Sequence, residues 1–123
     1  MFQHAQSRPD EEVCGLIGAV DGIPESYYAI DNCHDARAIR FSMDTLQQIE
    51  ATRKIRKNGE TLLGVFHSHP KGAAIPSSVD RAEADDPELI HLICSLNQQG
   101  VLEMRGYKTT QGQVADEVNL QIV

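Results

Sequence analysis

The sequence predicts a single α/β domain, covering residues 1–123, built around one mixed β-sheet. The length of 123 residues suits one domain with a modest hydrophobic core. Apolar runs with the length of strands alternate with one clear amphipathic helix, and the last runs have hairpin-like spacing. Apolar residues make up 41% and charged residues 24%, which is typical of a globular protein and not of a disordered one.

The N-terminal part of the chain is expected to form a short helix followed by two strands. Phe2–Ser7 is compatible with a helix that ends before a proline. Val13–Val20 is a nearly continuous apolar run and is typical of a buried strand. Asp21-Gly22 is a turn signal, and it predicts a second strand over Ser26–Ile30.

The clearest predicted helix begins after Asp44, which can cap it, and Asn58-Gly59 ends it. Gln47, three residues after Asp44, resembles the second half of a capping box. Four apolar residues are expected to share one side of this helix: Met43, Leu46, Ile49 and, more roughly, Ile55.

The C-terminal part is expected to contain a central strand, a loop, a short helix and three closing strands. Thr61–Phe66 is a second apolar run that leads directly into a His-Ser-His-Pro segment. Lys71–Pro76 is predicted to be a loop, and Ser77 or Ser78 to cap a short helix that continues to about Ala84. The three closing strands are predicted over Leu89–Leu96, Val101–Lys108 and Gln113–Val123.

Composition argues against several classes of function. The formal net charge is −7, and an acidic chain with few aromatic residues is a poor partner for nucleic acid. No apolar run approaches the length of a membrane span, and Met1–Asp10 has no apolar segment typical of a secretory signal. We therefore expect a cytoplasmic protein. The three cysteines are widely spaced without a C-x-x-C pair, which favours reduced thiols over a disulfide or thiolate metal site.

The segment that follows the central strand carries a candidate metal site. His67 and His69 are two residues apart, so on a strand both side chains point to the same face. Ten residues separate His69 from Asp80, enough for a loop to return a carboxylate to the same ion. Two histidines and one aspartate match the ligand number of a catalytic zinc, which keeps a fourth position for water. His67, His69 and Asp80 are therefore the candidate ligands of one Zn²⁺ per chain.

Two further residues have the chemistry that hydrolysis requires. Glu12 stands just before the first strand, and a carboxylate near a metal but not bound to it can act as general base and then general acid. Ser77 can donate a hydrogen bond to a tetrahedral oxyanion. Glu12 and Ser77 are therefore the candidate catalytic residues.

Each signal also has an interpretation without chemistry. Two surface histidines before a proline arise often by chance. Ser77-x-x-Asp80 has the form of a helix capping box. Glu12 is one of three consecutive acids and suits a solvated loop. Spacing alone therefore leaves both interpretations open, and a zinc deaminase is a further alternative that the missing C-x-x-C pair weakens.

The combined motif resembles the JAMM metalloproteases, also called MPN-plus, in their small prokaryotic form. The family signature is a Glu, then His-x-His-Pro, a short loop and Ser-x-x-Asp, which here is Glu12, His67-Ser68-His69-Pro70 and Ser77 to Asp80. Prokaryotic members often show Pro-x-Glu-x-Cys-Gly, and alignment on Cys14-Gly15 selects Glu12 rather than Glu11.

The resemblance implies a mixed, mostly antiparallel, curved sheet flanked by helices, similar to the cytidine deaminase fold. It implies a zinc peptidase or isopeptidase that processes a ubiquitin-like sulfur-carrier protein after its C-terminal Gly-Gly. A catalytically silent MPN-type scaffold and a phage-tail-type endopeptidase are the alternatives. Many relatives have a strand before the first helix, and this chain starts at Met1 too late for one. The start is therefore expected to be internal or the sheet to lack that edge strand. Oligomeric state is not predicted.

Overall fold

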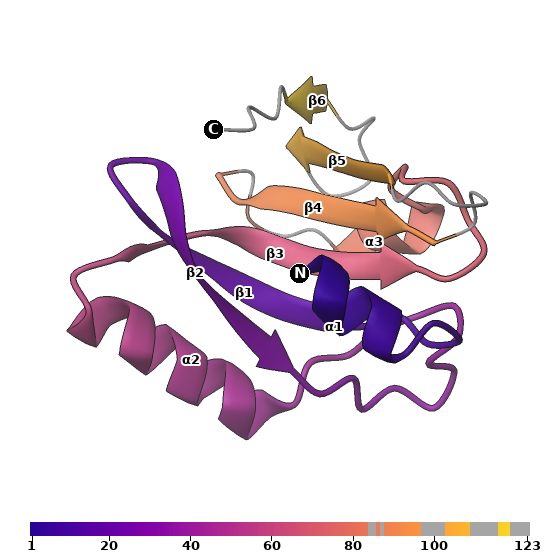
Figure 1. Ribbon diagram of the computed structural model, residues 1–123, viewed down its shortest axis with the longest axis horizontal. Helices are drawn as coiled ribbons and strands as arrows, with labels where there is room; N and C mark the ends of the chain where they lie inside the picture. The colour runs from indigo at the N-terminus through magenta and orange to yellow at the C-terminus, as the bar shows by residue number, and fades with distance from the viewer. Residues whose placement is uncertain (84–85, 87, 97–102, 109–115, 119–123) are drawn as a thin grey trace.

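The computed structural model describes residues 1–83, 86, 88–96, 103–108 and 116–118. Within these residues the strands form one six-stranded sheet in the order β2-β1-β3-β4-β5-β6 (Figure 1). The strands are β1 Cys14–Val20, β2 Ile23–Ile30, β3 Thr61–His69, β4 Ile90–Ser95, β5 Glu103–Lys108 and β6 Asp116–Val118. The helices are α1 Phe2–Ser7, α2 Thr45–Lys57 and α3 Ser78–Glu83.

The sheet is mixed and mostly antiparallel, as predicted. β1 pairs antiparallel with both β2 and β3, and β4 pairs antiparallel with β5, as β5 does with β6. β3 and β4 are the parallel pair, and the connection between them contains α3. Because β3 is an inner strand, the loop that follows it leaves the sheet between its two edge strands, at the end where β3 terminates (Figure 1).

Two helices cover opposite faces of the sheet, because successive strand residues point to opposite sides. On one face Ala5 of α1 packs with Ile17 and Phe66. On the other face Leu16 and Ile55 belong to a second buried cluster, which also includes Ala51 of α2 and Cys14 of β1. The flanking helices implied by the family resemblance are therefore confirmed, while a likeness to the cytidine deaminase fold stays a prediction.

The buried side of α2 differs from the predicted one. Leu46 and Ile49 are 78% and 52% exposed, whereas Ile55 is 2% exposed. At 3.6 residues per turn, Leu46 and Ile49 lie on the side of the helix opposite Ala51 and Ile55. The helix cannot bury both sides, and the side with Ala51 packs on the sheet, where a small residue permits close approach. The prediction was wrong for Leu46 and Ile49, while Met43 is partly buried against the same cluster.

The cap of α2 is confirmed in its first half only. The Asp44 carboxylate accepts the backbone N–H of Gln47 at 2.9 Å, as expected for an N-cap. The Gln47 amide does not return to Asp44 but hydrogen-bonds the backbone N–H and the carboxylate of Asp31. Gln47 therefore ties the helix to the end of β2, a contact that local spacing does not encode.

The parallel pairing of β3 and β4 depends on one glycine. A Cβ at Gly64 would collide with the backbone carbonyl of Ile90. Because Gly64 has no side chain, β4 can approach closely at the point where the parallel register begins, opposite Ile90.

The remaining predicted elements are present among the described residues, although β2 begins at Ile23 rather than at Ser26. Asp21 and Gly22 have positive φ angles of 52° and 78° and form the turn between β1 and β2. The expected strand residues 101–102, 113–115 and 119–123 and the helix residue Ala84 lie outside the described part of the chain. No helix among the described residues is long and apolar enough to span a membrane.

Candidate metal centre

The last residues of β3 bring two histidines together. His67 and His69 point to the same face, and both side chains are buried. Their Nε2 atoms lie 3.1 Å apart, while Ser68 between them points to the other face and accepts the Val13 N–H. The convergence predicted from the two-residue spacing is confirmed.

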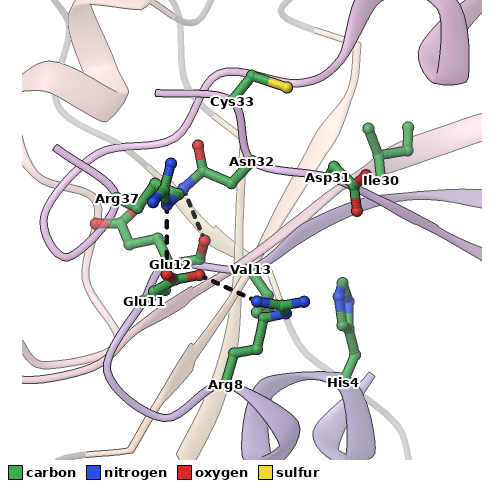
Figure 2. A pocket seen from close by; sticks show the side chains of 10 residues that line it. All are labelled: His4, Arg8, Glu11, Glu12, Val13, Ile30, Asp31, Asn32, Cys33 and Arg37. Carbon is green, nitrogen blue, oxygen red and sulfur yellow. Dashed lines mark hydrogen bonds and ion pairs between the residues drawn. The ribbon is translucent and has the colours of Figure 1, made fainter. Parts of the chain in front are cut away.

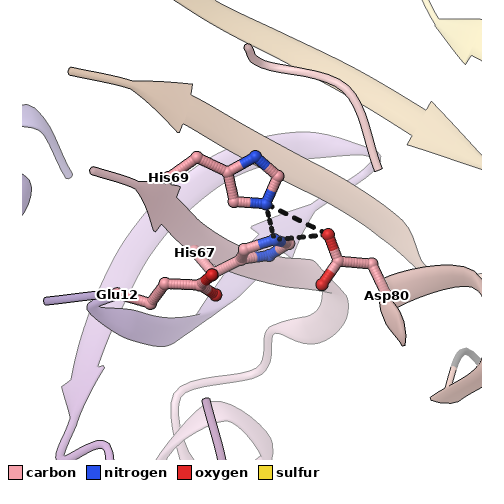
Figure 3. A group of neighbouring side chains, drawn as sticks. All are labelled: Glu12, His67, His69 and Asp80. Carbon is pink, nitrogen blue, oxygen red and sulfur yellow. Dashed lines mark hydrogen bonds and ion pairs between the residues drawn. The ribbon is translucent and has the colours of Figure 1, made fainter. Parts of the chain in front are cut away.

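Asp80, in the first turn of α3, completes a triangle with the two histidines. Its Oδ2 atom lies 3.1 Å from the Nε2 of His67 and 3.1 Å from the Nε2 of His69 (Figure 3). The capping box is present as well: Oδ2 accepts the Ser77 N–H, and Ser77 Oγ accepts the Asp80 N–H. The structural and the chemical interpretation of Asp80 are therefore compatible, because the cap fixes the carboxylate that faces the histidines.

Glu12, in the segment that precedes β1, is the fourth member of this cluster. The register pairs Cys14 with His67, so Glu12 lies beside the end of β3. It is 5% exposed, and one ligand atom from each of Glu12, His67, His69 and Asp80 lies within 4.8 Å of the others (Figure 3). Its Oε1 has no hydrogen-bond partner. A buried carboxylate oxygen without a partner is costly and indicates a missing ligand or proton.

Glu11 has a different environment from its neighbour. Its carboxylate forms surface ion pairs with Arg8 at 3.7 Å and with Arg37 at 3.3 Å (Figure 2). The alignment that selects Glu12 as the residue facing the histidines therefore agrees with the geometry of both carboxylates.

The backbone of Glu12 is held by the loop that follows β2. The Glu12 N–H donates to the Arg37 carbonyl at 2.6 Å, and the Asn32 side-chain amide donates to the Glu12 carbonyl at 2.8 Å. These contacts border a cavity of about 350 Å³ (Figure 2). Sequence reasoning did not find Asn32 or Arg37, because nothing in the local pattern of residues 32–37 shows that the loop returns to Glu12.

The hydrogen bonds of His69 set its tautomer. His69 Nδ1 lies 2.8 Å from the Ala73 carbonyl, which can only accept, so Nδ1 carries the proton. In the neutral ring the Nε2 lone pair then faces the cluster, as a metal ligand requires. His67 instead stacks on Phe41, with ring centroids 4.7 Å apart, and its buried Nδ1 has no partner. Neither Phe41 nor Ala73 was predicted.

The cluster changes the pKa values of its members. Burial raises the pKa of Glu12 to about 7, although the neighbouring His69 opposes this. Burial lowers the pKa of His67, with Asp80 opposing. For His69 and Asp80 burial is outweighed by hydrogen bonds. The hydrogen bond with Asp80 raises the pKa of His69, and the hydrogen bonds with His67 and His69 lower the pKa of Asp80.

The cluster fits a divalent metal by an observation independent of any family. The three atoms Nε2, Nε2 and Oδ2 are 3.1 Å apart in each pair. Tetrahedral ligands about 2.0 Å from a zinc ion lie about 3.3 Å from one another, close to this spacing. Two imidazole nitrogens and the Asp80 carboxylate, with the second carboxylate of Glu12 nearby, form the donor set of a hydrolytic zinc site.

A surface cleft of about 530 Å³ leads to the cluster. Glu12, His69 and Ser77 all border it, together with Ile39 and Lys71. Ser77 is exposed, and because its Oγ accepts the Asp80 N–H, its hydroxyl proton is free to be donated into the cleft. The structure thus brings all five predicted site residues to one location, whereas the role of each stays a prediction.

The fold and the cluster together define a JAB/MPN-like domain with a candidate metal centre. The family described as prokaryotic homologs of the JAB domain matches residues 1–107. The chain belongs to this family, and the sequence resemblance is confirmed.

Two relatives are similar over much of the chain. A CysO-cysteine peptidase of Mycobacterium tuberculosis is 25% identical over 119 residues, 95% of this chain and 81% of that protein. A desampylase of Haloferax volcanii is 29% identical over 93 residues, 74% of this chain and 67% of that protein.

Two solved structures share the fold. A protein from Desulfitobacterium hafniense is 36% identical, with a TM-score of 0.84 over 96% of this chain and 82% of that one. A JAB1/MPN domain protein from Archaeoglobus fulgidus is 18% identical, with a TM-score of 0.56 over 98% of this chain and 85% of that one, and this likeness concerns the fold alone.

Proposed function

We propose that the protein is a zinc-dependent peptidase or isopeptidase. The observation that carries the proposal is the buried cluster of Glu12, His67, His69 and Asp80, whose ligand atoms lie within 4.8 Å of one another. Four ionisable side chains gathered at the end of a central strand have a stability cost, which a bound metal would offset.

His67, His69 and Asp80 are the residues that would hold the zinc. Bound zinc supplies Lewis-acid activation of the scissile carbonyl and of a water molecule. The Ala73 carbonyl keeps the lone pair of His69 Nε2 directed into the site, and the Ser77 cap keeps the carboxylate of Asp80 there.

Glu12 moves the proton in this proposal. Its Oε1 is unpartnered beside the three ligands, so it can take the proton of the attacking water and give it to the leaving amine. Ser77, which borders the cleft, donates a hydrogen bond from its hydroxyl to the developing oxyanion. One such donor typically contributes about 3 kcal/mol to lowering the barrier.

The proposed substrate is a ubiquitin-like sulfur-carrier protein, cut after its C-terminal Gly-Gly. Two relatives are named a CysO-cysteine peptidase and a desampylase, and the family resemblance implies the same substrate class. Glycine residues carry no side chain, so a Gly-Gly tail can lie with its backbone close to the buried histidines.

The test is cleavage of a carrier fused through its Gly-Gly to a short peptide, with zinc supplied. The wild type is expected to release the carrier, while Glu12→Gln keeps the metal and loses about 10²–10⁴-fold in kcat. Glu11→Gln is the matched control, because its carboxylate lies in surface ion pairs, and it is expected to retain wild-type turnover.

Equal turnover of Glu12→Gln and Glu11→Gln would contradict the role given to Glu12. If the zinc-loaded wild type cleaved none of a panel of Gly-Gly fusions, the scaffold alternative would replace the peptidase.

A further inference from the structure

The loop segment Gly72–Ala74, between His69 and Asp80, lies over the sheet face that carries His67 and His69. Three consecutive backbone carbonyls in this segment each accept a hydrogen bond from a side chain. The pairs are Ser95 Oγ to Gly72 at 2.7 Å, His69 Nδ1 to Ala73 at 2.8 Å and Tyr107 Oη to Ala74 at 2.9 Å. A loop without regular structure is therefore fixed at three successive residues.

The two hydroxyl donors come from the strands next to β3. Ser95 is the partner of His69 in the parallel register of β4, and Tyr107 lies on β5. Both are buried, and Tyr107 packs with Ala74 and Ile93 in a small apolar cluster. The loop is thus attached to the sheet by its own buried alanine as well as by hydrogen bonds.

The middle carbonyl of the three connects this attachment to the candidate metal centre. Ala73 is the acceptor that fixes the proton of His69 on Nδ1 and leaves Nε2 facing His67 and Asp80. The position of the Ala73 carbonyl depends on the peptide units on either side, which Ser95 and Tyr107 hold. Acceptors of this kind, one step beyond the ligand, typically change metal affinity about 10–100-fold when removed.

We propose that Ser95 and Tyr107 are positioning residues for the metal centre, acting through the Gly72–Ala74 carbonyls on His69. This rests on the proposed zinc site and adds to it two residues from β4 and β5 that touch neither metal nor substrate. Both hydroxyls keep the loop in the one conformation that gives His69 its ligand tautomer and that leads the chain to Ser77.

The test measures zinc affinity in Tyr107→Phe and Ser95→Ala by competition with a chromophoric chelator. Tyr107→Phe keeps the ring that packs on Ala74 and removes only the hydroxyl, so the fold is retained. Each variant is expected to bind zinc about 10-fold more weakly, and the double variant more weakly still.

Matched controls exist on the edge strand β2. Tyr28→Phe and Ser26→Ala each remove a hydroxyl that contacts Glu60, away from the cluster. Each control loses a hydroxyl group of the same residue type and is expected to bind zinc with wild-type affinity. A purely structural role for Tyr107 would leave its variant and Tyr28→Phe with equal zinc affinity, and would overturn the inference.

A second measurement separates the inference from the proposed function. On a cleaved Gly-Gly substrate at saturating zinc, Tyr107→Phe is expected to lower kcat with little change in KM, because Tyr107 itself does not line the cleft. If wild type binds no zinc, the proposed site and this inference fall together. If wild type binds zinc and Tyr107→Phe and Ser95→Ala bind it equally well, only the inference fails.

Discussion

At the scale of residues, Glu12 is a buried carboxyl whose ionisation is unfavourable in the metal-free protein. Its carboxylate is buried, one oxygen has no partner, and burial raises its pKa to about 7. Its ordinary pKa is 4.5, so the unfolded chain ionises this carboxyl more readily than the folded protein does. The protonated form therefore stabilises the fold, and this contribution is complete below about pH 4.5 and lost as the pH rises through about 7.

This gives a prediction for the metal-free protein. The stability of the wild type relative to Glu12→Gln is expected to fall between about pH 4.5 and pH 7, because only the wild type must ionise the buried Glu12 carboxyl. The expected change is on the order of 1–2 kcal/mol, since solvent screens part of the charge.

The measurement is urea unfolding of both proteins at each pH in the presence of a chelator. Asp80, whose pKa is lowered by its hydrogen bonds to His67 and His69, stays ionised in both proteins and does not contribute to the difference. A stability difference that does not change with pH would show that Glu12 is ionised at no cost in the folded state.

At the scale of elements, α2 shows where a local pattern is insufficient. The apolar residues of its sequence fall on two sides, and only the packing against β1 and β3 decides which side is buried. The exposed Leu46 and Ile49 satisfied the helical spacing equally well. Helix existence, cap and end were predictable from local chemistry, whereas its orientation depends on distant strands.

The orientation of α2 leads to a stability prediction. Ile55→Ala is expected to destabilise the fold by about 2–4 kcal/mol, because it leaves a cavity between the helix and the sheet. Ile49→Ala is the matched control on the opposite side and is expected to change stability by less than about 0.5 kcal/mol. Denaturant unfolding of both variants checks the pair, and similar losses in the two would place the buried side elsewhere.

The site shows the same division between local and distant information. Strand alternation placed His67 and His69 on one face, and the spacing of Ser77 and Asp80 predicted a cap, because both depend on neighbours in the chain. The Ala73 carbonyl, the Phe41 ring and the Tyr107 hydroxyl were not predicted. Each reaches the site through tertiary contacts that no periodicity encodes.

At the scale of the whole molecule, the sheet order explains why the cluster forms. β1 and β3 are neighbours, so the segment before β1 lies beside the end of β3. The parallel connection from β3 to β4 contains α3 (Figure 1). Asp80 of α3 thereby returns to the two histidines at that same end. Residues far apart in sequence thus meet at one strand end, covered by the loop that the β4 and β5 hydroxyls hold.

The most direct test of the metal centre is the zinc content per chain, measured by mass spectrometry of untagged protein. The wild type is expected to hold close to one zinc and Asp80→Ala much less. Asp44→Ala, which removes the cap of α2 without touching the cluster, is expected to keep the wild-type content. Wild-type protein that retains no zinc after zinc is offered and the excess removed would contradict the assignment of this cluster as a zinc site.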